Sequence, residues 1–282
     1  MTNQNSNSCC WAKCLKLFRS KKNIVNVINL HGVIGSVNFK QGLSLNSLNK
    51  DIESAFKDKN TKAVVLSINS PGGSPVQSEL IGKRIEQLSK QKNIPVIAVV
   101  EDMAASGGYW LACSASEIIV ADNSLVGSLG VIFSGFGLNK AIEHLGVERR
   151  VYTKGNNKSL LDPFLPEKKE DVEMILNVQS DIYENFKKQV HKGRGDRIKL
   201  EDEKLFSGAI WSGRQAIEIG LADKIGDLYT EMQERFGVDV DIKIVNQDKS
   251  WIKKKLGLSI DFVIQKISDN ILNIADKKME LR

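Results

Sequence analysis

Short apolar runs alternate with longer amphipathic stretches along most of the chain. Apolar, β-branched runs of strand length predict strands at residues 24–30, 62–69, 95–100, 117–121 and 149–152. The stretches between them carry apolar residues at helical spacing and predict helices at residues 45–57, 76–88, 106–115 and 138–145. Repeated strand–helix units bring their strands together in one direction, so the pattern predicts an α/β fold with a parallel sheet.

A longer amphipathic segment follows these units. Residues 167–191 predict one long helix, because the apolar side chains recur at near-helical spacing: Val172, Ile175, Leu176, Ile182 and Phe186. Such a helix either packs on its own domain or mediates contacts between subunits. Residues 238–245 alternate like a strand and residues 259–275 like an amphipathic helix. We therefore expect an N-terminal segment at 1–22, a main domain at 23–236 and a C-terminal extension at 237–282.

Length and composition allow a large folded core. The 282 residues are 41% hydrophobic and 26% charged, as expected for one main globular domain with additions. No stretch of about 18 apolar residues occurs, so no transmembrane helix is predicted. The N-terminus also lacks the uninterrupted apolar run of a secretory signal. The expected location is therefore the cytoplasm or the periphery of a membrane.

Basic residues moderately outnumber acidic ones. The chain has 40 Lys and Arg against 34 Asp and Glu, a net charge of +6, and much of the excess lies at residues 13–22 and 253–255. A nucleic-acid-binding face would interleave basic and aromatic residues, and the sequence shows no such module, so nucleic acid is not an expected partner. Attraction to acidic lipid explains the charge more economically.

The N-terminal segment contains three of the four cysteines. Cys9, Cys10 and Cys14 stand among apolar and basic residues in a short stretch that would be amphipathic as a helix. Such a segment lies on a membrane surface, packs on a partner, or is a frayed tail. Three thiols without a fourth ligand nearby do not make a structural zinc site. The uneven cysteine spacing argues against a disulfide framework and favours a reducing compartment.

The candidate chemistry begins at a serine that follows a predicted strand. Ser106 stands in the run D-M-A-A-S-G-G-Y at residues 102–109. A serine in this position either projects its hydroxyl from a tight turn as a nucleophile or caps the helix that follows. Gly107 and Gly108 allow a substrate carbonyl to approach the backbone without a side chain in the way.

Two further polar segments accompany this serine. The run S-P-G-G-S-P at residues 70–75 joins a predicted strand to a predicted helix. Its glycines can aim backbone N–H groups at a developing oxyanion, although a plain Pro-Gly turn would look the same. The run T-K-G-N-N-K-S at residues 153–159 is a polar loop, in which a lysine is ordinarily solvated.

Together these motifs resemble the signal peptide peptidase A family, serine peptidases with a Ser-Lys dyad on the fold shared by Clp protease and the crotonases. The resemblance runs from residue 24 to residue 228 and includes G-S-L-G-V at 127–131, G-R-G at 193–195 and a closing segment at 206–223. It implies a fold of repeated β-β-α units around a parallel sheet, with a helical extension. By position it implies these roles: nucleophile, Ser106; general base, Lys158; lysine-orienting hydroxyl, Ser128; oxyanion hole, Gly73 and Gly107.

A Ser-Lys pair makes chemical demands that the sequence can be checked against. Serine attacks only when a neutral base accepts its proton, and the ordinary pKa of lysine is about 10.4. Burial must therefore lower the lysine pKa, and Leu160 and Leu161 offer apolar cover beside Lys158. A hydroxyl such as that of Ser128 would orient the amine without adding negative charge.

Other chemistries are less favoured. His31, His144 and His191 each have an ordinary structural interpretation, although a Ser-His-Asp triad stays open because triads do not follow sequence order. No H-E-x-x-H motif and no paired C-x-x-C framework occurs, so neither a metal nor another cofactor is expected.

The expected function is a serine endopeptidase that hydrolyses signal-peptide remnants or other unfolded or apolar peptides. A crotonase-like acyl-CoA hydratase or isomerase would share the glycine turns but would normally use acidic residues where this chain has serine. An inactive scaffold would show damage to the dyad, and none is visible. The resemblance implies a homo-oligomeric ring or dome, and the sequence leaves open whether Ser106 and Lys158 pair within one chain or between chains.

Overall fold

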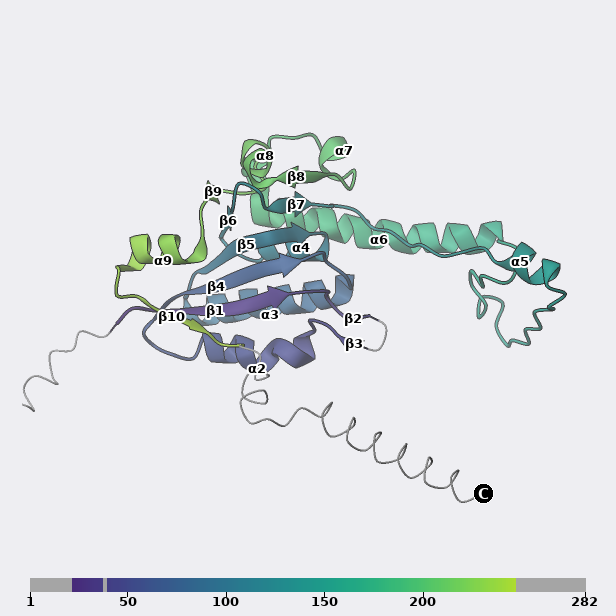
Figure 1. Cartoon of the computed structure of the whole chain (residues 1–282), viewed down its shortest axis with the longest axis horizontal. Helices are drawn as coiled ribbons and strands as arrows, with labels where there is room; N and C mark the ends of the chain where they lie inside the picture. Colours follow the sequence, from purple (N-terminus) through teal and green to yellow (C-terminus); the bar gives the residue numbers. More distant parts are fainter. Residues whose placement is uncertain (1–21, 38–39, 247–282) are drawn as a thin grey trace, which may run out of the picture. The chain divides into compact units, whose positions relative to one another are not determined.

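The computed structural model describes residues 22–37 and 40–246, and its central element is a mostly parallel sheet (Figure 1). The order of its main strands is β10-β1-β4-β5-β6-β9, and each neighbouring pair is parallel. These strands are β1 (Ile24–His31), β4 (Thr61–Ser70), β5 (Val96–Ala105), β6 (Glu117–Val120), β9 (Lys224–Ile225) and β10 (Asp241–Ile244). The predicted α/β fold with a parallel sheet is confirmed.

Four short strands complete the described β-structure. A third neighbour of β5 is β7 (Leu125–Gly127), which runs parallel to it and pairs antiparallel with β8 (Ile210–Ser212). A separate hairpin pairs β2 (Ser36–Val37) with β3 (Lys40–Gln41). Strands this short carry too few alternating residues to be predicted from sequence.

Helices cover both faces of the sheet. The described helical elements are α2 (Leu45–Ala55), α3 (Pro75–Lys92), α4 (Gly107–Ala112), α5 (Asn139–His144), α6 (Lys169–Arg194), η1 (Gly195–Arg197), α7 (Asp202–Leu205), α8 (Gly213–Glu218) and α9 (Leu228–Phe236). The main apolar core lies between the sheet and α2, α3 and α4. A smaller core lies on the other face, where Met232 of α9 packs on Val27 and Val65. A parallel sheet needs this cover on both faces.

Most of the predicted elements form, one does not, and some predictions fall on residues that the structure does not describe. The strand predicted at 149–152 is wrong: these residues are irregular, and Tyr152 is 91% exposed. No strand of the described chain lies beside them to supply the hydrogen bonds that a strand needs. The predictions for Cys9, Cys10, Cys14 and the helix at 259–275 concern residues outside the described part.

The long helix α6 confirms the helix predicted at 167–191. It begins at Lys169 and ends at Arg194, where Gly195 adopts a positive φ. Its C-terminal part packs on the main core through Phe186 and Val190. Its N-terminal part extends past the sheet and carries α5 and the loop after it at its far end (Figure 1). Among residues 22–37 and 40–246, neither α6 nor any other helix is apolar enough over sufficient length to span a bilayer.

A buried ion pair attaches the C-terminal end of α6 to the closing segment of the domain. Arg194 is 1% exposed, donates two hydrogen bonds to the Asp223 carboxylate at 2.7 and 2.8 Å, and donates a third to the Gly220 carbonyl. Burial alone would raise the pKa of Asp223. The Arg194 hydrogen bonds, the Ile118 N–H and the charges of Arg194 and Arg197 together outweigh burial and lower the pKa below its ordinary value. The carboxylate also accepts from the Ile118 backbone N–H.

We expect Asp223→Asn to destabilise the fold strongly, because it leaves the buried Arg194 charge without a partner. The loss should be about 3 kcal/mol, or a fall in Tm of roughly 6–12 °C at pH 7. Because folding lowers the Asp223 pKa, its stabilisation is present above about pH 3.8 and is lost as the pH falls through the folded-state pKa. The variant should therefore have a flatter acid limb in thermal scans. Asp122→Asn is the control, since its pair with Arg214 is exposed and should contribute under about 1 kcal/mol.

Candidate active site

The candidate nucleophile sits on a sharp turn between a strand and a helix. Ser106 follows β5 and precedes α4, with φ 51° and ψ −119°, a conformation that side-chain-bearing residues rarely adopt. Its backbone N–H donates to the Gly127 carbonyl at 2.8 Å, and its carbonyl accepts from Trp110 at 3.0 Å. The Ser106 hydroxyl makes no hydrogen bond within the described residues. It caps no backbone N–H either, which removes the simple helix-cap interpretation.

The glycine turn after β4 packs directly against this elbow. Gly72 has φ 97°, and a Cβ there would lie 2.7 Å from the Gly107 nitrogen and 2.8 Å from the Ser106 Cβ. Gly73 has φ 144°, and a Cβ there would collide with the Ile34 backbone. Both positions therefore require glycine, for conformation and for space. The S-P-G-G run is more than a surface turn, because it forms a wall of the site.

Two backbone donors near Ser106 have no acceptor in the described chain. The N–H groups of Gly73 and Gly107 donate to none of the described residues. They lie close together, because a Cβ on Gly107 would be 3.4 Å from the Gly73 nitrogen. Gly107 is buried, where an N–H group normally finds a partner, and Gly73 is open to the solvent. Two adjacent free donors at the edge of a pocket are suited to an incoming oxygen.

A small apolar pocket opens beside the serine. Its volume is about 130 Å³. The lining residues are Gly73, Pro75, Ser106, Gly107, Trp110, Gly130, Val131, Ile132, Ile182 and Phe186. Trp110 stacks on Phe186 of α6 with ring centroids 5.4 Å apart, which gives the pocket a rigid wall. An apolar side chain of modest size suits a pocket of this size and lining.

Ser128 is held next to the elbow by the short strand β7. It follows Gly127, whose carbonyl binds the Ser106 N–H, and its own N–H donates to the Ala209 carbonyl at 2.7 Å. Its φ is 53°, a second strained serine beside the first. The Ser128 hydroxyl has no hydrogen-bond partner in the described part of the chain. The structure therefore brings four of the five sequence-predicted residues into one neighbourhood: Gly73, Ser106, Gly107 and Ser128.

The fifth predicted residue, Lys158, lies elsewhere in the single chain. It is exposed in the loop between α5 and α6, and it is absent from the lining of the Ser106 pocket. That loop is carried at the far end of α6 from the sheet (Figure 1). The apolar cover expected from Leu160 and Leu161 does not bury the lysine in one chain, although both leucines are themselves half-buried. One chain by itself does not assemble the dyad in this structure.

The three histidines lie outside the Ser106 pocket, and two of them have polar partners. His31 lies 3.0 Å from the Ser67 hydroxyl and 3.2 Å from Glu101, and His191 lies 3.2 Å from Asp202. His144 ends the exposed helix α5. None of them lines the Ser106 pocket. The geometry of one chain thus gives no support to a Ser-His-Asp triad at Ser106.

Helix α4, which follows Ser106, carries the buried phenol of Tyr109, and the buried thiol of Cys113 lies at its C-terminal end. The Tyr109 hydroxyl donates to the Leu221 carbonyl at 2.7 Å, and burial raises the pKa of Tyr109 well above its ordinary value. Burial likewise raises the pKa of Cys113 to about 12. The Cys113 thiol therefore stays protonated at neutral pH and is inert as a second nucleophile.

Sequence reasoning missed the serine that holds the glycine turn. Ser70 ends β4 fully buried; its hydroxyl donates to the Gly32 carbonyl at 2.7 Å and accepts from the Gly72 N–H at 3.2 Å. Ser70 was visible only as the first letter of S-P-G-G. Its hydrogen-bond partner Gly32, directly after β1, is 38 residues away, so no local pattern could show the role.

We expect Ser70→Ala to lower kcat by between about 10- and 100-fold with little change in KM, because the glycine turn loses the bond that fixes it. Ser67→Ala is the matched control. Ser67 lies on the same strand and is also buried, but its hydroxyl binds Glu101 and not the turn. Steady-state kinetics together with thermal melts separate the two roles. An equal kcat loss in both variants would show a general effect of destabilisation.

The chain is similar in sequence to a known protein family and to several curated proteins. The model of Peptidase family S49 matches residues 88–243, more than half of the chain. The chain is 39% identical over 271 residues to a Na(+)/H(+) antiporter NhaA of Brucella melitensis, covering 93% of this chain and 37% of that protein. It is 32% identical over 212 residues to an Enterococcus faecium protein provisionally named signal peptide peptidase SppA, covering 73% of this chain and 61% of that protein.

A solved structure is also similar. It is a mutant of the 1510-N membrane-bound stomatin-specific protease, matched at 17% identity with a TM-score of 0.48 over 81% of this chain and 100% of that one. The chain spans less than two thirds of the length of the two curated relatives above.

Proposed function

The chain belongs to peptidase family S49, a family of serine proteases, and from that premise we propose that it is an endopeptidase with Ser106 as nucleophile and Lys158 as general base. The observation that carries the proposal is the strained Ser106 elbow, packed against two free glycine N–H groups. A free hydroxyl beside free donors is what acyl transfer requires.

The reaction follows from these groups. Ser106 Oγ attacks the peptide carbonyl carbon while the neutral Lys158 amine accepts its proton, and the N–H groups of Gly73 and Gly107 stabilise the oxyanion. The lysine then gives the proton to the leaving amine, which departs as the acyl-enzyme forms. Water, deprotonated by the same lysine, hydrolyses the ester. Ser128 holds the amine toward Ser106 throughout.

The dyad is formed between chains in this proposal. In one chain Lys158 is exposed and does not line the Ser106 pocket, and the hydroxyls of Ser106 and Ser128 have no partner among the described residues. We call residues 129–168 together with the N-terminal part of α6 the arm. A homo-oligomeric ring or dome, in which the arm of one chain reaches the Ser106 elbow of the next, supplies the missing base and buries it. Exposed apolar side chains on the arm that line neither the Ser106 pocket nor a second cavity on the arm support this, since a solvated surface rarely gathers them: Leu145, Val147 and Tyr152.

The proposed substrates are unfolded or apolar peptides, including signal-peptide remnants. The Ser106 pocket is apolar and about 130 Å³, which suits a modest apolar side chain next to the scissile bond. An enclosed oligomer would admit extended chains and exclude compact domains.

Labelling with a serine-reactive fluorophosphonate tests the proposal. The purified protein should gain one adduct per chain by intact mass, and Ser106→Ala should gain none. An acyl-CoA hydratase or isomerase, or an inactive scaffold, would take no adduct at Ser106. Labelling that persists in Ser106→Ala would assign the nucleophile to another residue and overturn the role of Ser106.

A further inference from the structure

An unbroken stretch of backbone beside the Ser106 pocket has no hydrogen-bond partners. Residues 129–137 follow Ser128 and run along α6 toward α5 without regular structure (Figure 1). None of their N–H or C=O groups is paired within residues 22–37 and 40–246. Unpaired backbone of this kind is a template on which an extended peptide can add as a strand.

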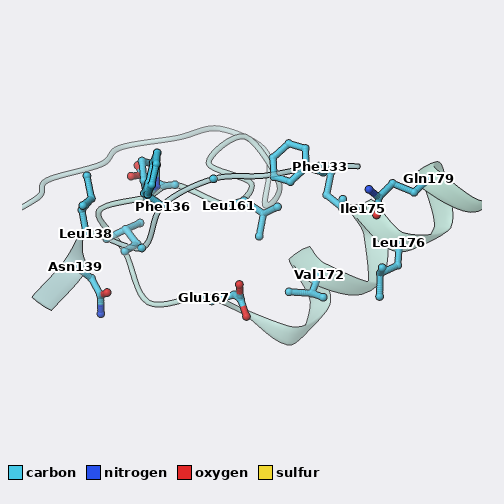
Figure 2. Close-up of a pocket in the computed structure, with 15 residues that line it drawn as sticks. Phe133, Phe136, Leu138, Asn139, Leu161, Glu167, Val172, Ile175, Leu176 and Gln179 are labelled. Carbon is cyan, nitrogen blue, oxygen red and sulfur yellow. The ribbon is translucent and has the colours of Figure 1, made fainter. Parts of the chain in front are cut away.

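The same stretch connects two hollows. Gly130, Val131 and Ile132 line the pocket of Ser106. Farther along the stretch, a second cavity of about 550 Å³, which we call the arm cavity (Figure 2), is lined by Phe133, Gly135, Phe136 and Gly137. The two hollows are therefore consecutive along one segment of chain. They are also consecutive along α6, where Gln179 lines the arm cavity and Ile182, one turn later, lines the Ser106 pocket.

The walls of the arm cavity are mainly apolar. Figure 2 shows Leu161 and Val172 pointing into the same space from the loop and from α6. Ile175 and Leu176 continue the α6 wall. A volume of this size is within the range of sites that bind small ligands or bulky side chains.

Hydrogen bonds hold these walls in place. The Leu161 N–H donates to the Asp171 carboxylate at 3.2 Å, and Asp171 is itself buried in the first turn of α6. The Leu138 N–H donates to the Pro163 carbonyl at 2.6 Å, which ties the two loop segments together. Leu161 adopts φ 51°, a conformation that persists only where its surroundings enforce it. These contacts fix the positions of the walls, so the arm cavity is a defined part of the folded arm.

We propose that the arm cavity is a distal substrate subsite, which takes an apolar side chain of the same extended peptide that is cleaved at Ser106. This inference rests on the proposed function. The peptide pairs with the free backbone of residues 129–137 and places one side chain in the Ser106 pocket. Val131 lines the Ser106 pocket and Phe136 lines the arm cavity, five residues farther along the stretch (136 − 131). A paired peptide keeps step with the stretch at about 3.3 Å per residue, so an apolar residue roughly four to six positions away reaches the arm cavity. The continuity of the free backbone with both hollows favours a peptide as the occupant.

This subsite would make the enzyme select for two apolar features in one unfolded segment. A modest side chain would lie at the scissile bond and a bulkier one at a fixed distance from it. The smaller Ser106 pocket takes the modest side chain, and the larger arm cavity takes the bulkier one.

A series of fluorogenic peptides tests the proposal. The peptides share one sequence, except that a single Phe or Ser stands at one of the positions four to six residues from the cleaved bond, on either side. At one position the wild type should cleave the Phe peptide about tenfold better in kcat/KM than the Ser peptide. Leu176→Gln should reduce that preference to about twofold. Val178→Gln is the matched control, because Val178 is 51% exposed and Leu176 55% exposed on the same helix, but Val178 does not line the cavity.

The remaining outcomes separate the explanations. A preference that Leu176→Gln leaves intact, or that Val178→Gln reduces equally, would overturn the subsite. An equal loss on the Phe and Ser peptides, together with smaller species in sedimentation velocity, would show that a second copy covers the arm cavity. If the wild type cleaves no peptide and takes no fluorophosphonate, the proposed function itself has failed and the subsite fails with it.

Discussion

Ser106→Ala should reduce peptide hydrolysis by at least about 10³-fold while leaving the fold intact, because the change removes the attacking oxygen and nothing else. The Ser106 hydroxyl holds no hydrogen bond within the described residues, so its loss leaves no buried group unsatisfied. The elbow itself is fixed by backbone bonds to Gly127 and Trp110, which alanine preserves. Turnover of an unstructured protein such as casein measures the effect.

The control for this variant is the second strained serine. Ser128→Ala should lower the rate but retain fluorophosphonate labelling, because the nucleophile is still present and only the orientation of the lysine amine is lost. Circular dichroism and a thermal melt should place both variants within about 0.5 kcal/mol of the wild type. Wild-type turnover in Ser106→Ala would exclude Ser106 as the nucleophile.

Lys158→Ala should be comparably inactive, and Lys158→Arg should not restore activity. A guanidinium stays protonated at any pH that the protein tolerates, so it cannot accept the serine proton. Lys154→Ala is the matched control, since Lys154 is exposed in the same loop but is not the residue proposed as the base. A strongly active Lys158→Arg variant would mean that the residue supplies charge and not a base.

Mixing variants shows whether two chains share the site. In a co-expressed 1:1 mixture of Ser106→Ala and Lys158→Ala subunits, a dyad formed between neighbours should recover about a quarter of wild-type activity, since each site needs the intact residue from both chains. A dyad within one chain should recover none. Wild type mixed 1:1 with the double variant provides the cross-check: about a quarter of the activity for shared sites and about half for sites within one chain. A fully active monomer in sedimentation would exclude the oligomeric model.

The sequence by itself determined those features that depend on neighbours along the chain. The buried strands β1, β4 and β5 were predictable because β-branched runs of strand length have few alternatives. The elbow and the glycine turn were recognisable because each is written in a few consecutive residues around Ser106 and Gly73. The family assignment followed from the order of such local motifs along the chain, and the family comparison confirms it.

Only the tertiary structure decided how those local pieces meet. It set the bare Cα of Gly72 against the Ser106 elbow, and it made Ser70 the anchor of the glycine turn through Gly32, directly after β1. It left residues 149–152 without the strand that their composition predicts, because a strand forms only where another strand accepts its hydrogen bonds. It also placed Lys158 on the arm, away from the Ser106 pocket. Each of these results depends on contacts between residues far apart in sequence, and local spacing carries no information about such contacts.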